Sequence, residues 1–155
     1  MSTDEPGHVL PLLLLGGFRT IVDAVHVELA AQGHPEARPV HGFVLQAVGP
    51  DGATAADIGR RLGVSKQAAG KHVDALVRLG YVRVDADPTD GRRRIVRRTD
   101  RGHEFLVRSE AVFDTVRARW AAALGAERLR ALEHDLRRVV PGAALRLDVP
   151  GWFGG

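Results

Sequence analysis

The stretch TAADIGRRLGVSKQAAGKHVDALVRLGYV, residues 54–82, decides the fold. Thr54 followed by Asp57 is typical of a helix N-terminus, where a hydroxyl and an acid satisfy free backbone N–H groups. Gly63 suits the left-handed conformation that ends such a helix, and Ser65 is placed to begin a second one. Two short helices joined by a tight glycine-containing turn form a helix-turn-helix. We predict that the second helix has an inner face made of Ala69, Val73 and Leu76.

A β-hairpin is predicted directly after this pair of helices. Residues 81–86 (YVRVDA) alternate apolar and polar side chains as a strand does, and residues 94–98 can return as a second strand. Between them, residues 87–91 (DPTDG) are a cluster of turn-forming residues. A hairpin that follows a helix-turn-helix in this way is a wing.

Helices are also predicted on both sides of this region. Residues 9–32 have an apolar face at helical spacing, formed by Leu14, Phe18, Ile21, Val25 and Leu29. Pro39 can begin a short helix, and Thr99 begins a long one that Gly125 interrupts. The long helix is expected to turn Leu106, Phe113, Val116 and Trp120 inward, and the helix after Gly125 to carry an apolar stripe of Leu129, Leu132, Leu136 and Val139. The fold class expected is mainly α (α+β).

Composition narrows the classes of protein and site. A chain of 155 residues with 45% hydrophobic and 26% charged residues suits one folded domain. The absence of cysteine excludes disulfides, cysteine–zinc sites and thiol-based redox sensing. The seven histidines include no His-x-x-x-His pair, so we expect no metal site and no cofactor. Neither a P-loop nor the G-x-G-x-x-G, G-x-S-x-G or H-E-x-x-H motif is present, so no enzyme is predicted.

The termini and the apolar segments predict a cytoplasmic protein with no membrane partner. Residues 1–6 carry acids rather than the basic start of a secretory signal. The longest apolar run, residues 9–18, is shorter than a bilayer span and contains Pro11, Gly16 and Gly17.

The basic residues are unevenly distributed along the chain. Lys66 and Lys71 are the only lysines among 22 Lys and Arg residues, and both lie in the second helix of the pair. The excess of arginine by itself is also what a GC-rich coding sequence produces. The positions are more informative, because a run of arginines lies on the hairpin and just after it, at Arg92, Arg93, Arg94, Arg97, Arg98 and Arg101.

Residues 54–102 resemble the winged helix-turn-helix of the MarR family of bacterial transcriptional regulators. The resemblance is carried by the segment from Ser65 through Leu76 to Gly80-Tyr81-Val82. It is also carried by the Asp87-Pro88-x-Asp90-x-Arg92 wing tip, with Thr99 and Gly102 at the matching distance.

The resemblance implies one MarR-like domain over residues 1–155. Its dimerisation helices would be residues 9–48 and 99–140, its winged helix-turn-helix residues 54–98, and its tail residues 141–155. Such proteins bind DNA as dimers on two half-sites, so a homodimer on a pseudo-palindromic double-stranded operator is expected. In the tail, Trp152 and Phe153 are expected either to clamp the partner subunit, or to belong to a tail that folds on its own subunit or is partly disordered.

The resemblance also implies which residues contact DNA. The second helix of the pair, which begins after Ser65, would be the recognition helix. Its start would enter the major groove, and the wing tip would enter the minor groove. The predicted DNA-binding residues are Ser65, Lys66, Gln67, Lys71, Asp90, Arg92, Arg93 and Arg94. Weaker phosphate candidates are Arg60, Arg61, Arg97, Arg98 and Arg101, and His72 borders the core face. The alternative for all of them is an ordinary solvated basic surface.

The family pattern usually has Leu immediately before the threonine that follows the wing, whereas this chain has Arg98. We expect Arg98 either to extend into solvent or to contact a phosphate.

The resemblance implies a repressor released by a small, commonly aromatic ligand. His26, His41 and Trp120 are candidates for the ligand pocket. Two alternatives remain at this point: a winged helix that binds an acidic protein partner instead of DNA, and a metal-responsive regulator.

Overall fold

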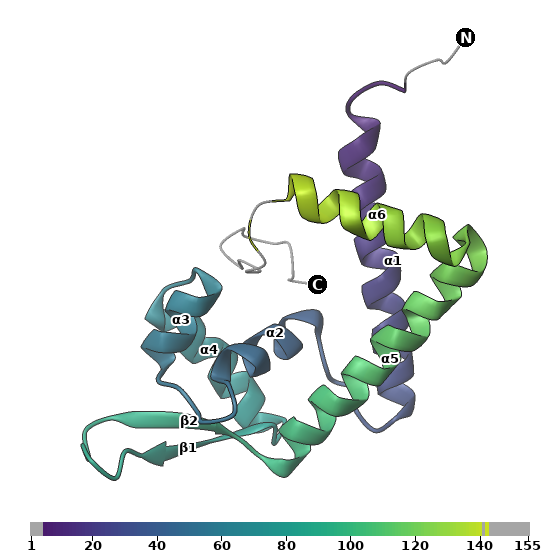
Figure 1. Ribbon diagram of the computed structural model, residues 1–155. Coiled ribbons are helices and arrows are strands. Elements are labelled where there is room, and N and C mark those ends of the chain that lie inside the picture. The colour runs from purple at the N-terminus through teal and green to yellow at the C-terminus, as the bar shows by residue number, and fades with distance from the viewer. Residues whose placement is uncertain (1–4, 141, 143–155) are drawn as a thin grey trace.

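The computed structural model describes residues 5–140 and residue 142, so Trp152 and Phe153 lie outside the described residues. This part of the chain is mostly helical, with one two-stranded antiparallel sheet (Figure 1). Its elements are α1 (Val9–Ala31), α2 (Pro39–Val48), α3 (Ala55–Leu62), α4 (Lys66–Arg78), β1 (Val82–Ala86), β2 (Arg94–Arg98), α5 (Asp100–Leu124) and α6 (Ala126–Val139). The predicted mainly-α fold with a winged helix-turn-helix is confirmed.

Short-range hydrogen bonds build the helix-turn-helix as predicted. The Thr54 hydroxyl accepts from the Asp57 backbone N–H at 3.1 Å, and the Asp57 carboxylate accepts from the Thr54 N–H at 3.1 Å. Gly63 has the left-handed conformation expected of it, with φ 69° and ψ 29°. The Ser65 hydroxyl accepts from the Ala68 N–H at 3.0 Å and so begins α4. The predicted inner face of α4 is buried.

The wing is a hairpin that extends away from the helices (Figure 1). Val82 pairs with Arg98 at its base and Ala86 with Arg94 near its tip. A third segment joins the sheet at Ala53, which exchanges two backbone hydrogen bonds of 3.0 and 2.8 Å with Val96. This bridge was not predicted, and it ties the start of the helix-turn-helix to β2, which lies between Ala53 and β1.

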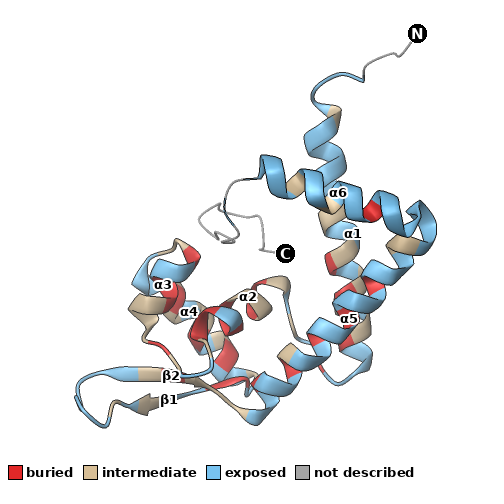
Figure 2. Cartoon of the chain, viewed as in Figure 1, coloured by how far each residue is buried: buried red, intermediate tan, exposed pale blue. Residues whose placement is uncertain are grey.

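The core lies where the inner faces of α1 to α5 meet the base of the wing (Figure 2). Tyr81 and Phe105 are its largest fully buried side chains, with ring centroids 5.1 Å apart. The Tyr81 hydroxyl lies 2.8 Å from Nδ1 of buried His34, and the Arg101 guanidinium stacks 5.0 Å from the centre of the tyrosine ring. The end of α1, the start of β1 and the start of α5 therefore share one cluster around Tyr81.

The inner face predicted for α5 is partly wrong. The buried residues of this helix are Gly102, Phe105, Ser109, Val112 and Val116. Of the four residues predicted, only Val116 is among them, Leu106 and Trp120 are half-buried, and Phe113 is 41% exposed. The error arises because α5 contacts α1 along one row and leaves the adjacent row, with Leu106 and Phe113, facing a cavity described below.

Two apolar faces remain uncovered in the single subunit. The first half of α1 exposes its leucines, and Leu14, predicted to be internal, is 45% exposed. By length and composition alone, helix α1 could cross a membrane. Only 11% of its most apolar 18-residue segment is buried in the single subunit. On α6, Leu129 is buried but Val139 is 73% exposed. The apolar faces predicted for α1 and α6 are therefore exposed over much of their length in the single subunit.

Two arginines hold the C-terminal end of α2, and this corrects the expectation for Arg98. Its Nε donates to the Leu45 carbonyl at 2.9 Å and its Nη2 to the Gln46 carbonyl at 3.5 Å. Arg61 donates to the Ala47 carbonyl at 2.5 Å. The last carbonyls of a helix have no partner within it, and they form the negative end of the helix dipole. Arg98 therefore caps a helix, and burial lowers its pKa.

We predict that Gly102→Ala destabilises the chain by about 1–3 kcal/mol, because overpacking forces the backbone to move. A Cβ at this position would lie 2.0 Å from the Tyr81 carbonyl oxygen. Gly70→Ala is the matched control: a Cβ there meets nothing within 4 Å, so the helix should gain about 0.5–1 kcal/mol. Urea unfolding of both variants measures the difference, and equal stabilities would contradict the packing described here.

We predict that Arg98→Met lowers the free energy of unfolding by about 1–2 kcal/mol. The substitution keeps an apolar stem but removes the charged donor from the α2 carbonyls. Arg94→Met, at the other end of the same strand, removes an exposed guanidinium that makes no hydrogen bond among the described residues. Chemical denaturation should separate the two variants; an equal loss would mean that Arg98 does not act as a cap.

Candidate nucleic-acid interface

The start of α4 presents a free basic surface. Lys66, Gln67 and Lys71 are exposed, and their side chains make no hydrogen bond or ion pair within residues 5–140. Ser65 is also exposed, but its hydroxyl is used as the helix cap. The unpaired N–H groups and the positive dipole end of a helix N-terminus favour anions. Both lysines of the chain therefore add to a site that is already electropositive.

Aspartates order the backbone of the wing tip. The Asp90 carboxylate accepts from the Arg92 backbone N–H at 3.1 Å, and the Asp87 carboxylate accepts from the Thr89 N–H at 2.9 Å. These are the local turns for which Asp is suited. The guanidinium groups of Arg92 and Arg94 are exposed and have no ion pair in the described part of the chain. The tip is thus fixed in its backbone, while two of its cations stay available.

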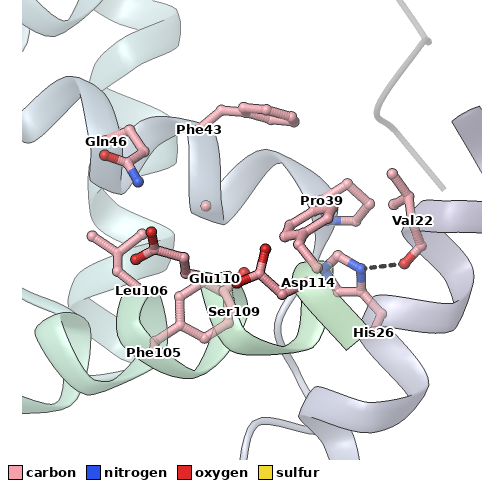
Figure 3. A pocket seen from close by; sticks show the side chains of 12 residues that line it. Val22, His26, Pro39, Phe43, Gln46, Phe105, Leu106, Ser109, Glu110 and Asp114 are labelled. Atoms are coloured by element: carbon pink, nitrogen blue, oxygen red, sulfur yellow. Dashed lines mark hydrogen bonds between the residues drawn. The ribbon is translucent and has the colours of Figure 1, made fainter. Parts of the chain in front are cut away.

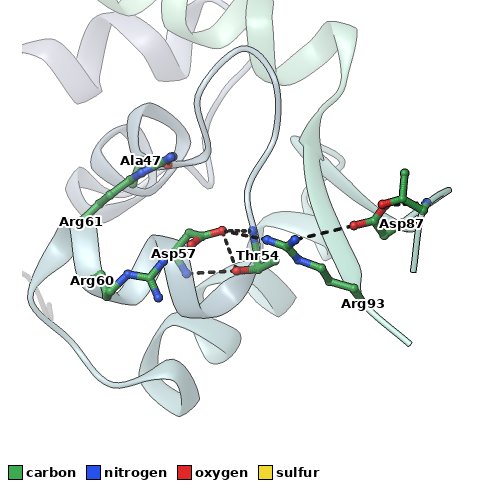
Figure 4. A network of polar contacts seen from close by, with 8 residues as sticks. Ala47, Thr54, Asp57, Arg60, Arg61, Asp87 and Arg93 are labelled. Atoms are coloured by element: carbon green, nitrogen blue, oxygen red, sulfur yellow. Dashed lines mark hydrogen bonds and ion pairs between the residues drawn. The ribbon is translucent and has the colours of Figure 1, made fainter. Parts of the chain in front are cut away.

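Arg93 differs from its neighbours because its guanidinium lies between two carboxylates (Figure 4). It is 3.8 Å from an Asp57 oxygen and 3.9 Å from an Asp87 oxygen. Asp57 also pairs with Arg60. Since Asp57 belongs to the cap of α3 and Asp87 to the wing, Arg93 connects the wing to the helix-turn-helix.

Both carboxylates in this network have lowered pKa values. Hydrogen bonds from the Thr54 hydroxyl and backbone are the main cause for the Asp57 pKa, with Arg60 and Arg93 adding to them. The backbone and hydroxyl of Thr89 lower the pKa of Asp87, again with help from Arg93. The charged form of each carboxylate is therefore favoured by the fold.

The weaker phosphate candidates have partners within the subunit. Arg60 and Arg61 hold Asp57 and the end of α2, as described above. Arg97 donates to the Asp51 carbonyl at 2.7 Å. Arg101 donates to the carbonyls of Leu79 and Gly33, both at 3.2 Å. His72 is half-buried, and burial lowers its pKa, which favours the packing role over contact with a ligand.

A cavity of about 360 Å³ lies between α1, α2 and α5, behind this surface (Figure 3). It is lined by Val22, His26, Pro39, Gly42, Phe43, Gln46, Phe105, Leu106, Ser109, Glu110, Phe113 and Asp114. Among the described residues, no group of three or more His, Asp or Glu side chains could hold a metal ion.

Of the three predicted pocket residues, only His26 lines this cavity. His41 is 5% exposed, and its Nδ1 accepts from the Arg38 backbone N–H at 3.0 Å, so it caps α2. Burial and the nearby Arg38 lower its pKa to about 4. Trp120 packs against α1, with its ring 3.3 Å from the place of a Cβ on Gly17. His41 is thus used by a local helix cap and Trp120 by packing against α1, and neither lines the cavity.

Residues 39–93, which run from the start of α2 to the tip of the wing, match the sequence model of the MarR family. The match covers the helix-turn-helix and the first strand of the wing, so this part of the chain is similar to the MarR family. A search of curated proteins finds no match to the chain.

Solved structures extend the MarR-family likeness to the flanking helices. The YusO protein from Bacillus subtilis is 22% identical with a TM-score of 0.69, and the match covers 90% of this chain and 100% of that one. The transcriptional repressor CouR from Rhodococcus jostii RHA1, solved on a 23-mer DNA duplex, is 22% identical with a TM-score of 0.68, covering 90% and 97%. A MarR family protein from Mycobacterium tuberculosis, in complex with salicylic acid, is 26% identical with a TM-score of 0.59, covering 90% and 100%. The chain has the fold of MarR-family transcriptional regulators.

We predict that the stabilising effect of Asp57 on the helix-turn-helix depends on pH. Its pKa is lower in the folded chain than its ordinary value, so its contribution is complete at neutral pH and is lost as the pH falls through the lowered pKa. The stability difference between the wild type and Asp57→Asn should therefore be largest near neutrality and shrink in acid. The control is Asp74→Asn, an exposed carboxylate on α4 without a hydrogen bond in the described residues. Denaturation curves at several pH values test this; a constant difference would contradict it.

Proposed function

We propose that the chain is a homodimeric, sequence-specific regulator of transcription that binds double-stranded DNA through α4 and the wing. One observation carries the proposal. Lys66 and Lys71 near the start of α4 and Arg92 and Arg94 at the wing tip are exposed and have no partner among the described residues, while Arg93, Arg97 and Arg101 hold backbone carbonyls or carboxylates. We propose that the protein is cytoplasmic and has no enzymatic activity.

Each free side chain has a distinct role in the proposed complex. Lys66 and Gln67 read base edges in the major groove, and Lys71 contacts phosphate. The N–H groups at the start of α4, shaped by the Ser65 cap, hold a backbone phosphate. Arg92 enters the adjacent minor groove, where the negative potential attracts a guanidinium, and Arg94 supports it from the strand. Asp90 and Arg93 hold the wing in the conformation that this docking needs.

The exposed apolar faces support the homodimer. We assign residues 9–48 and 99–140 to subunit pairing within one domain that includes the winged helix-turn-helix at 54–98. The leucines at the start of α1 and the end of α6 at Val139 are uncovered in the single chain, and a second copy would bury them. The helix α4 and wing of each subunit, which together form its reading head, then face one half-site of a pseudo-palindromic operator. The two half-sites lie about one helical turn apart.

We further propose that the protein is a repressor released by a small molecule. The cavity has α1 and α5 on one side, which would pair the subunits, and α2 on the other. A ligand there contacts α1 and α5. It also contacts α2, whose C-terminal end is bonded to Arg61 of the helix-turn-helix and Arg98 of the wing. The relative solved with salicylic acid supports the existence of such ligands for this fold.

We predict that binding to a selected duplex weakens steeply with salt, with log K falling by about 0.9 per phosphate neutralised for each unit of log salt. Lys66→Ala and Gln67→Ala should relax sequence preference in the centre of each half-site. Arg92→Ala should weaken binding and alter preference at the flanks. Fluorescence anisotropy on duplexes selected from random sequence measures these effects.

Arg128→Ala is the control for this experiment, since it removes an exposed arginine on α6 that has no ion pair in the described residues. It should leave both affinity and sequence preference unchanged. Absence of binding to any duplex at low salt would overturn the proposal and favour a winged helix that binds an acidic protein. A monomer in sedimentation would remove the two-half-site argument.

A further inference from the structure

The walls of the cavity between α1, α2 and α5 are largely apolar and rich in aromatic rings (Figure 3). Phe43 comes from α2, and Phe105 and Phe113 come from α5, with Leu106 and Val22 between them. A volume of about 360 Å³ suits a small organic molecule with one or two rings. The faces of the aromatic rings carry partial negative charge, which attracts cations as well as apolar groups.

The charged groups of the cavity have one sign. Glu110 and Asp114 both line it, and their spacing of four residues places them on the same face of α5. No lysine or arginine is among the lining residues. Arg117 is the cation closest to Asp114 in sequence on this helix, and it is held by two bonds of 2.6 and 2.9 Å to Glu133 on α6. The negative charge at this wall therefore lacks a tightly bound partner within the described residues.

A hydroxyl lines the cavity and is available to a polar group. Ser109 is only 9% exposed, lines the cavity and makes no side-chain hydrogen bond within the described part of the chain. No fully buried side-chain oxygen among the described residues lacks a partner, so the Ser109 oxygen is open to the space of the cavity. On α1, the His26 Nδ1 donates to the Val22 carbonyl at 2.8 Å, so this edge of the imidazole is held in place. The Ser109 hydroxyl thus offers an acceptor to a ligand that brings N–H donors.

We propose that this cavity binds an organic monocation with an aromatic body, such as an amidinium or a benzylic ammonium. The ring packs among Phe43, Phe105 and Phe113, and the cationic group lies against Glu110 and Asp114. A carboxylate ligand of the same size is rejected, because it would meet two negative charges with no cation to compensate them. The inference rests on the small-molecule control proposed above and names the class of ligand.

The test uses the full chain in the absence of DNA, so that ligand binding is measured separately from operator binding. Isothermal titration calorimetry compares benzamidinium and benzylammonium with two probes of similar size, neutral benzyl alcohol and anionic benzoate. We expect both cations to bind about tenfold or more tightly than benzyl alcohol, and benzoate not to bind.

The paired substitution Glu110→Gln and Asp114→Asn should weaken the cations about tenfold and leave benzyl alcohol unchanged. Glu127→Gln is the control, since it removes an exposed acid on α6 that does not line the cavity. Both acids in the paired variant are exposed, so the fold should persist, and circular dichroism on heating checks this.

Three results would overturn the inference: benzoate binding as tightly as the cations, affinities unaffected by the paired substitution, or no binding of any probe. Anisotropy with the selected duplex is run on the same samples. Loss of DNA binding in the wild type would refute the proposed function, whereas cation binding in the calorimeter would still stand.

Discussion

The contact between the carbonyl of Tyr81 and the start of α5 fixes the arrangement of the molecule. That carbonyl accepts from the Thr99 N–H at 3.0 Å, the Thr99 hydroxyl donates to Gly80 at 2.6 Å, and Gly102 has no side chain to keep the helix away. The tyrosine ring from the same residue reaches His34 at the end of α1. These contacts around Tyr81 fix the positions of β1, α5 and α1 relative to one another. The orientation of the wing relative to the long helix follows from these contacts.

The arginines divide into two groups with different physical roles. Arg61, Arg98 and Arg101 donate to carbonyls at the ends of helices, where backbone groups would otherwise be unsatisfied. Arg92 and Arg94 keep their guanidinium groups free at the exposed tip of the wing. A rigid recognition surface requires both groups, because free charges are useful for binding only when the elements that carry them are held in place.

Local features of the fold could be predicted from the sequence, and long-range contacts could not. The caps at Thr54 and Ser65 and the turn at 87–91 depend on residues close in the chain, so they were predicted with their correct roles. Arg98 reaches a carbonyl 53 positions away, and the Ala53 bridge to Val96 spans a similar separation. The inner face of α5 was misassigned for the same reason. Its amphipathic pattern does not determine which of its apolar residues pack against α1 and which face the cavity. Of the predicted pocket residues the cavity contains only His26: His41 is used in a local cap of α2, and Trp120 packs on the distant helix α1.

The two lysines have a chemical consequence. They are the only side-chain amines in the sequence, and both are exposed on the first two turns of α4. Guanidinium groups are far weaker nucleophiles than free amines, so an acylating reagent would label this helix and leave the many arginines untouched. Acetylation would remove both positive charges from the recognition helix while the helix-capping arginines kept theirs. The two lysine charges at the start of α4 can therefore be removed chemically without disturbing the cation contacts that hold the fold together.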